Sequence, residues 1–123
     1  MRKLLISIAL PLFAVASAVA ASAGVYSPTQ GVICDKPAGF CADGTGVSAT
    51  WTEKYLGAEA AHKLSANMTD PAGFDGSVFG FSNRVYCDIK AQVCTKDKFS
   101  TVVNQAATKT LFGKLPPATK PVK

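Results

Sequence analysis

Four cysteines are the clearest candidates for a chemical role in this sequence. They are Cys34, Cys41, Cys87 and Cys94, and six residues separate the members of each close pair. Thiols can form disulfides, hold zinc or carry out dithiol redox chemistry. Structural zinc prefers C-x2–4-C pairs, and dithiol oxidoreductases use C-x-x-C at a helix start, so the spacing disfavours both. We therefore expect all four cysteines to form structural disulfides.

The two cysteine pairs lie in a sequence that repeats. Residues 32–41 and 85–94 both fit the pattern V-x-C-D-x4-[FV]-C. Apolar residues flank a four-residue centre, which predicts two β-hairpins with the cysteines facing each other across the strands, about 5.5 Å apart at Cα. This favours the local pairs Cys34–Cys41 and Cys87–Cys94. Crossed pairs between two stacked hairpins would also fit, because sequence alone does not choose among the three connectivities.

His62 is the only histidine. A hydrolase would need a nucleophile, a base and an orienting group in contact, and Ser48 or Ser82 could meet His62 only through the fold. We therefore expect His62 to lie on a helix surface rather than in a catalytic site.

Four acidic residues flank the predicted hairpins: Asp35, Asp43, Asp88 and Asp97. Paired carboxylates could act as acid and base or bind calcium, but no EF-hand spacing is present. Short turns favour aspartate because its carboxylate accepts hydrogen bonds from the backbone of the turn. We therefore predict that these four aspartates are turn residues.

Several aromatic residues could line a carbohydrate or peptide groove: Trp51, Tyr55, Phe79, Phe81 and Tyr86. A domain of this size needs most of its aromatic side chains for its own core. The groove is therefore the less favoured interpretation.

The secondary structure around these residues is predicted from the same sequence. Residues 25–31 are expected to form an irregular lead-in, and 43–46 a turn. A helix capped by Thr50, with Glu53 completing a capping box, should run to Asn67 and split at Gly57. Strands at 77–81, 85–88 and 92–95 would form a meander, and a second helix capped by Ser100 would end at Gly113. The fold class is α+β, a small disulfide-stapled domain over residues 24–113, with a disordered Lys/Pro-rich tail at 114–123.

The N-terminus has the order of a secretory signal. A cationic head at residues 1–3 precedes an apolar run at 4–19, and small residues offer cleavage after Ala18, Ala20 or Ala23. A transmembrane anchor would need a longer apolar run and a polar stop after it. We predict a cleavable signal peptide at residues 1–23 and a periplasmic or extracellular location, where disulfides persist.

Charge is unevenly distributed along the chain, whose formal net charge is +5. Residues 24–97 hold six Lys and Arg against eight Asp and Glu, whereas residues 98–123 hold five Lys and no acid. Nucleic-acid binding would require aromatic residues interleaved with the basic ones, and the aromatic residue we note for the tail, Phe112, lies at its helical edge. We predict a solvated tail and no nucleic-acid partner.

The motifs GVICDKPAGFCADGTGVS (31–48), TEKYLG (52–57), FSNRVYCD (81–88) and ATKTLFG (107–113) resemble those of the Fels prophage protein-like family, YcgJ-like small exported bacterial proteins. The resemblance spans nearly all of the chain after residue 23, and its cysteine-anchored motifs agree in both spacing and neighbours. It implies a bacterial, periplasmic setting and assigns no catalytic or binding residue. Arg84 departs from the pattern, since glycine would be expected before the second Val-x-Cys, and this bears on the tightness of the preceding turn.

These observations favour a non-enzymatic exported binding or interaction module whose partner is an envelope protein or polymer. The alternatives are a small envelope hydrolase acting on cell-wall material and a secreted enzyme inhibitor. The sequence predicts no catalytic residue, cofactor or metal, and no membrane span once the signal is removed.

Overall fold

The computed structural model describes residues 24–70 and 73–116. The predicted signal peptide lies outside these residues, as does the predicted tail from residue 117 onward. Within the described part of the chain, no helix is both long and apolar enough to cross a bilayer.

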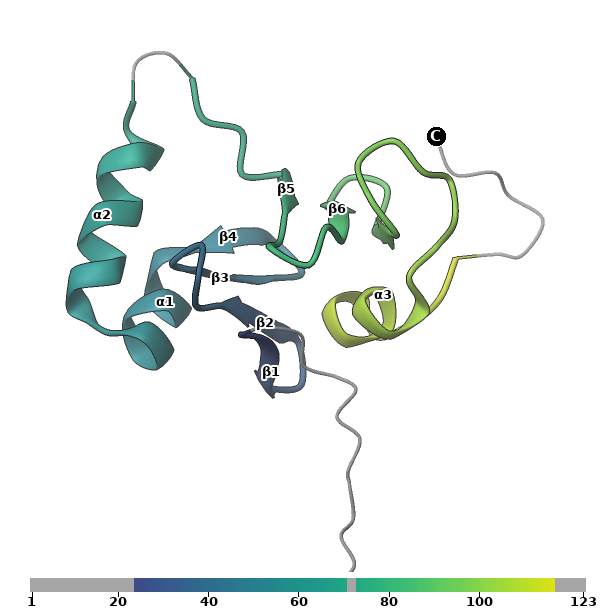
Figure 1. The fold of residues 1–123 in the computed structure, drawn as a ribbon, viewed down its shortest axis with the longest axis horizontal. Coiled ribbons are helices and arrows are strands. Elements are labelled where there is room, and N and C mark those ends of the chain that lie inside the picture. Colours follow the sequence, from purple (N-terminus) through teal and green to yellow (C-terminus); the bar gives the residue numbers. More distant parts are fainter. Residues whose placement is uncertain (1–23, 71–72, 117–123) are drawn as a thin grey trace, which may run out of the picture.

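The described residues form an α+β fold, as predicted, with two antiparallel sheets and three helices (Figure 1). Helices α1 and α2 lie at one end of the molecule and α3 lies at the other. The elements in chain order are β1 (Val25–Thr29), β2 (Val32–Asp35), β3 (Phe40–Asp43), β4 (Gly46–Ser48), α1 (Ala49–Leu56), α2 (Ala58–Met68), β5 (Val78–Gly80), β6 (Tyr86–Asp88), β7 (Val93–Thr95) and α3 (Gln105–Phe112). The first sheet has the order β1-β2-β3-β4, and the second is the predicted meander β5-β6-β7.

The sequence repeat extends to most of the fold. We call residues 25–56 the first repeat and residues 78–112 the second repeat. Each begins with an antiparallel pair, β1 with β2 or β5 with β6, continues into a disulfide hairpin and ends in a helix. Positions 53 residues apart correspond: the Lys36 N–H donates to the Gly24 carbonyl, as the Ile89 N–H donates to that of Ser77. Helix α2 lies in the segment that connects the two repeats.

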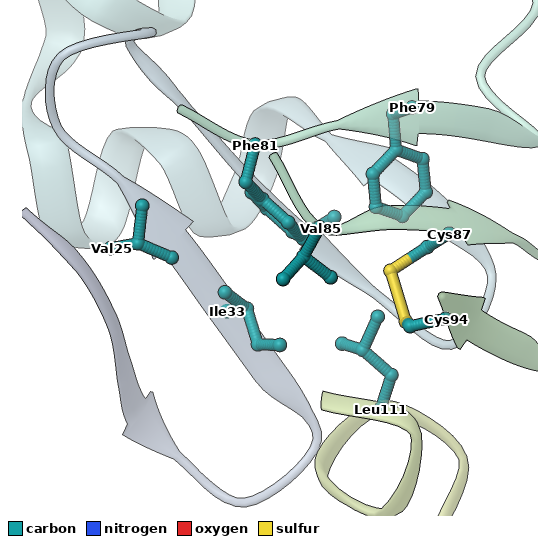
Figure 2. Packing of buried hydrophobic residues seen from close by; sticks show 9 residues of the cluster. Val25, Ile33, Phe79, Phe81, Val85, Cys87, Cys94 and Leu111 are labelled. Carbon is teal, nitrogen blue, oxygen red and sulfur yellow. A yellow bond between two sulfur atoms is a disulfide. The ribbon is translucent and has the colours of Figure 1, made fainter. Parts of the chain in front are cut away.

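The main hydrophobic core lies between the two repeats (Figure 2). The first repeat contributes Val25, Ile33 and Ala42, and the second contributes Phe79, Phe81, Val85, Cys87, Cys94 and Leu111. A smaller cluster of Val32, Cys34 and Cys41 packs beneath α1. Because the larger core draws on both repeats, each repeat buries its apolar surface mainly against the other.

The predicted irregular lead-in at residues 25–31 is wrong, because Val25–Thr29 forms an edge strand. Its register against β2 shifts between Tyr26 and Thr29, on either side of Pro28. Proline has no N–H and is tolerated in strands only at edges or bulges, so Ser27-Pro28 does not prevent strand formation here.

Both predicted helix caps are also wrong. Ser48, not Thr50, caps α1 by accepting a hydrogen bond from the Trp51 N–H, and Asn104, not Ser100, caps α3 by accepting one from Ala107. In each case the true cap lies at the end of a segment that pairs with the hairpin. The strand pairing, which the local pattern does not reveal, therefore decides where each helix starts. The predicted split at Gly57 and end at Gly113 are confirmed, and both glycines have positive φ.

Candidate functional site

Each disulfide closes one hairpin. Cys34 bonds Cys41 and Cys87 bonds Cys94, and each pair lies directly opposite across two strands. The Cα atoms of each pair are 4.0 Å apart, closer than the separation expected from the sequence. All four cysteines are fully buried. The disulfides are therefore internal supports of the hairpins.

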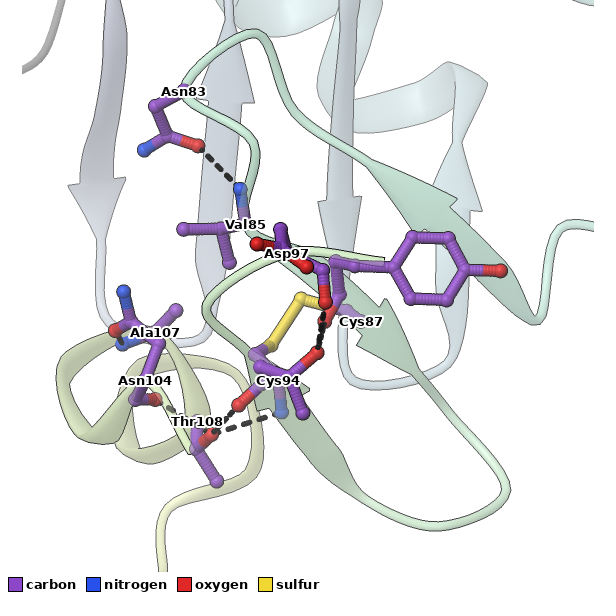
Figure 3. The surroundings of a disulfide bond; sticks show 10 residues. Asn83, Val85, Cys87, Cys94, Asp97, Asn104, Ala107 and Thr108 are labelled. Carbon is purple, nitrogen blue, oxygen red and sulfur yellow. Dashed lines mark hydrogen bonds between the residues drawn. A yellow bond between two sulfur atoms is a disulfide. The ribbon is translucent and has the colours of Figure 1, made fainter. Parts of the chain in front are cut away.

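A buried threonine joins each hairpin to its helix, and Figure 3 shows the one in the second repeat, Thr108. In the second repeat, Thr108 Oγ1 accepts a hydrogen bond from the Cys94 N–H at 2.9 Å. In the first repeat, Thr52 Oγ1 accepts from the Cys41 N–H at 2.8 Å and donates to the Ser48 carbonyl at 2.6 Å. The second repeat thus reproduces the internal framework of the first.

Each hairpin presents two faces, because alternate residues of a strand point to opposite sides. The disulfide face carries the cysteines. We call the opposite face the aspartate face. In the first repeat it consists of Ile33, Asp35, Phe40 and Ala42, and in the second repeat of Tyr86, Asp88, Val93 and Thr95.

The aspartate face of the first repeat is covered by the second repeat. The Phe40 ring stacks on that of Phe81 with the centroids 5.4 Å apart, and it meets Phe79 edge to face. The carboxylate of Asp35 is fully buried. It accepts hydrogen bonds from the Ser82 N–H at 2.6 Å and the Ser82 hydroxyl at 2.9 Å. This face is thus an internal docking surface for the Phe81-Ser82 segment.

The aspartate face of the second repeat instead lines an open cleft of about 160 Å³. Its walls include Tyr86, Asp88, Val93, Thr95, Lys98 and Phe99. Asp88 Oδ1 accepts a hydrogen bond from the Ala91 N–H, the bond that Asp35 Oδ1 accepts from Ala38 in the first repeat. Within the described residues no hydrogen-bond donor reaches Asp88 Oδ2, the counterpart of the oxygen that accepts from the Ser82 N–H in the first repeat. The cleft therefore offers a carboxylate oxygen to a donor from outside.

The loop after β7 forms one wall of this cleft and displays Phe99. The threonines of the two repeats are 56 residues apart rather than 53, so this loop is three residues longer than its counterpart before β4. Phe99 is 89% exposed and Val102 is 60% exposed. The loop is nevertheless held at both ends, because the Lys96 N–H donates to the Val102 carbonyl and Thr95 bridges to Val103.

The serines weighed as partners of His62 have other roles. Ser48 caps α1, and Ser82 donates its hydroxyl to Asp35. His62 lies on α2, beside a shallow hollow that also contains Glu53.

The four aspartates are confirmed as turn residues. Each accepts a hydrogen bond from a backbone N–H two or three residues further along the chain. Asp35 has the additional role described above, which spacing alone did not reveal. Asp43 likewise accepts from the Trp51 indole N–H at 3.0 Å.

The aromatic residues divide between core and surface. Phe79 and Phe81 are buried, Trp51 and Tyr55 stack on each other at half-buried positions, and Tyr86 lines the cleft. Sequence reasoning missed Phe99. The signal for it was a large apolar residue directly after the charged stretch Lys96-Asp97-Lys98.

Comparisons with known proteins agree with the resemblance seen in the motifs. Residues 25–112 match the family described as YcgJ protein. A relative in Escherichia coli (strain K12), called Uncharacterized protein YcgJ, is 38% identical over 96 residues, which cover 72% of this chain and 74% of that protein. No solved structure matches the chain. The disulfides are consistent with the oxidising, extracytoplasmic setting expected for such a protein. The chain belongs to the YcgJ family.

Proposed function

We propose that this protein is a non-enzymatic binding module of the periplasm or cell exterior, and that it binds a macromolecular partner through the cleft of the second repeat. The observation that carries the proposal is Phe99, whose ring is 89% exposed beside that cleft. Exposed aromatic side chains on ordered loops are typical anchors of binding interfaces.

The loop that carries Phe99 is held in one conformation by its own hydrogen bonds. The Phe99 N–H donates to Asp97 Oδ1 at 2.9 Å, and Thr95 Oγ1 donates to the Asp97 carbonyl at 2.8 Å. A loop already held in one conformation loses less entropy on binding than a disordered one. Burial of a phenylalanine ring on association then contributes roughly 2–3 kcal/mol.

The hydrolase alternative receives less support. The hydroxyls of Ser48 and Ser82 are engaged in the α1 cap and in the contact with Asp35, and both contacts belong to the framework of the fold. On the proposal, His62→Ala leaves partner binding and thermal stability unchanged.

The test is recovery of partners from an envelope extract by the immobilised oxidised protein and by its Phe99→Ser variant. Phe99 contacts little of its own protein, so the variant should fold normally and bind about 30-fold more weakly. Leu115→Ser is the matched control, because it removes another exposed apolar side chain away from the cleft. Equal recovery by wild type and Phe99→Ser would contradict the proposal.

A further inference from the structure

The contacts made by the first repeat indicate what kind of ligand the cleft of the second repeat would bind. In the first repeat the aspartate face is occupied, and the occupant is known: Phe81 lies on Phe40, and Ser82 donates to Asp35 through both its N–H and its hydroxyl. The second repeat presents the corresponding face with the corresponding carboxylate. Val93 and Thr95 are buried at the base of the cleft, and Tyr86 and Asp88 are partly exposed at its walls.

We infer that the cleft binds an exposed segment of another protein in which a large apolar residue is directly followed by serine or threonine. The apolar side chain would enter the cleft between Tyr86 and Phe99, above the buried Val93, which is the counterpart of Phe40. The backbone N–H and hydroxyl of the next residue would donate to Asp88 Oδ2 and Oδ1. This rests on the proposed function and specifies its partner.

The size and polarity of the cleft agree with this occupant. Its volume of about 160 Å³ accommodates one large side chain rather than a whole drug-sized ligand, which occupies roughly 300 Å³ or more. A carboxylate that accepts a backbone N–H and a hydroxyl together selects a polypeptide with a hydroxyl side chain, since hydrogen bonds to a charged group are the stronger ones.

A second molecule of the same chain is a poorer occupant. The residues of the first repeat that correspond to Phe81 and Ser82 are Pro28 and Thr29, so that segment lacks a large apolar side chain before its hydroxyl. Trp51 and Tyr55 also stack with their centroids 5.9 Å apart, where the second repeat has Ala107 and Leu111. Those two aromatic rings pack on the disulfide face of the first repeat. The disulfide face of the second repeat instead packs against the first repeat.

The probe is a synthetic peptide with the sequence of residues 78–83, Val-Phe-Gly-Phe-Ser-Asn, blocked at both ends. It is titrated into the intact oxidised protein labelled with ¹⁵N, up to about 5 mM, because short peptides bind in the millimolar range or somewhat tighter. We expect saturable shifts at the amides of Tyr86, Asp88 and Phe99. Replacing the serine of the peptide by alanine should weaken binding about tenfold.

The protein variant Asp88→Asn should weaken binding of the same peptide about tenfold, because it removes the charge and one acceptor oxygen. Glu59→Gln is the matched control, since it removes one negative charge from the exposed surface of α2 and should leave binding unchanged.

Absence of saturable shifts overturns the inference, as do shifts confined to the first repeat or equal affinity for the serine and alanine peptides. Self-association through the cleft at rising protein concentration, or binding of a cell-wall glycan fragment there in place of the peptide, overturns it too. If the peptide does not bind but partner recovery still depends on Phe99, the inference is wrong and the proposed function stands. If the peptide does not bind and partner recovery does not depend on Phe99, both the inference and the proposed function are wrong.

Discussion

The two buried threonines provide the sharpest test of how this fold is held together. Thr52 and Cys41 are both fully buried, and Thr52 Oγ1 is the acceptor for the Cys41 N–H. The substitution Thr52→Val keeps the shape of the side chain but removes this acceptor. The Cys41 N–H is then buried without a partner.

The expected cost follows from that unsatisfied donor. Leaving a buried N–H without an acceptor costs about 1–3 kcal/mol, whereas the nearly isosteric valine adds little cavity or strain. For a domain of this size, a loss of about 2 kcal/mol is a substantial fraction of the free energy of unfolding and lowers Tm by roughly 8–16 °C.

The assay is equilibrium urea unfolding of the oxidised protein. Thr108→Val should cost about as much as Thr52→Val, because Thr108 accepts from the Cys94 N–H in the same way. Thr50→Val on the exposed surface of α1 is the control and should change stability by less than about 0.5 kcal/mol. If Thr52→Val unfolds at the same urea concentration as wild type, the hydrogen bond does not hold the helix to the hairpin.

Three further predictions follow from other contacts. Arg84 has φ 81°, so Arg84→Gly should raise the free energy of unfolding by about 1 kcal/mol in urea titration, and a destabilised variant would contradict this. Asp35→Asn removes one acceptor oxygen facing Ser82 and should lower stability by about 2 kcal/mol, whereas equal melting temperatures would show that the buried contact contributes nothing. The Ser77 hydroxyl and N–H lower the pKa of Asp75 below its ordinary value of 3.8. The stabilisation from this contact is therefore complete above that pH and is lost as the pH falls below it. Ser77→Ala should raise the Asp75 pKa in an NMR titration, and an unchanged value would refute the assignment.

Much of the fold was predictable because the repeat is visible in the spacing of the cysteine motifs. The hairpins, the meander and the split at Gly57 all follow from local spacing and turn residues. Helix starts were mistaken because Ser48 and Asn104 become caps only once the preceding residues pair with a strand. Local sequence does not report such long-range pairing.

Arg84 shows the same limit in a single residue. It occupies the position that corresponds to Gly31, and both residues have positive φ, at 81° and 94°. The turn is formed despite the arginine, with the Phe81 N–H bonded to the Val85 carbonyl at 2.9 Å. The surrounding contacts therefore impose a conformation that the residue itself disfavours.

The site was less accessible to sequence reasoning than the fold. Asp35 and Asp88 occupy the same position of the motif, each directly after a cysteine, yet one is buried under Ser82 and the other faces a cleft. Which hairpin is covered depends on how the two repeats stack. That arrangement is a property of the tertiary structure, and no pattern within either hairpin encodes it.

The locality of the disulfides has a mechanical consequence. Each bond spans a sequence separation of only seven residues, so neither one ties the first repeat to the second. A force applied to the chain ends would pull the repeats apart through noncovalent contacts alone, while each cross-linked loop stayed closed. Each closed loop withholds about 25 Å of contour length, which chemical reduction would release in two separate extensions.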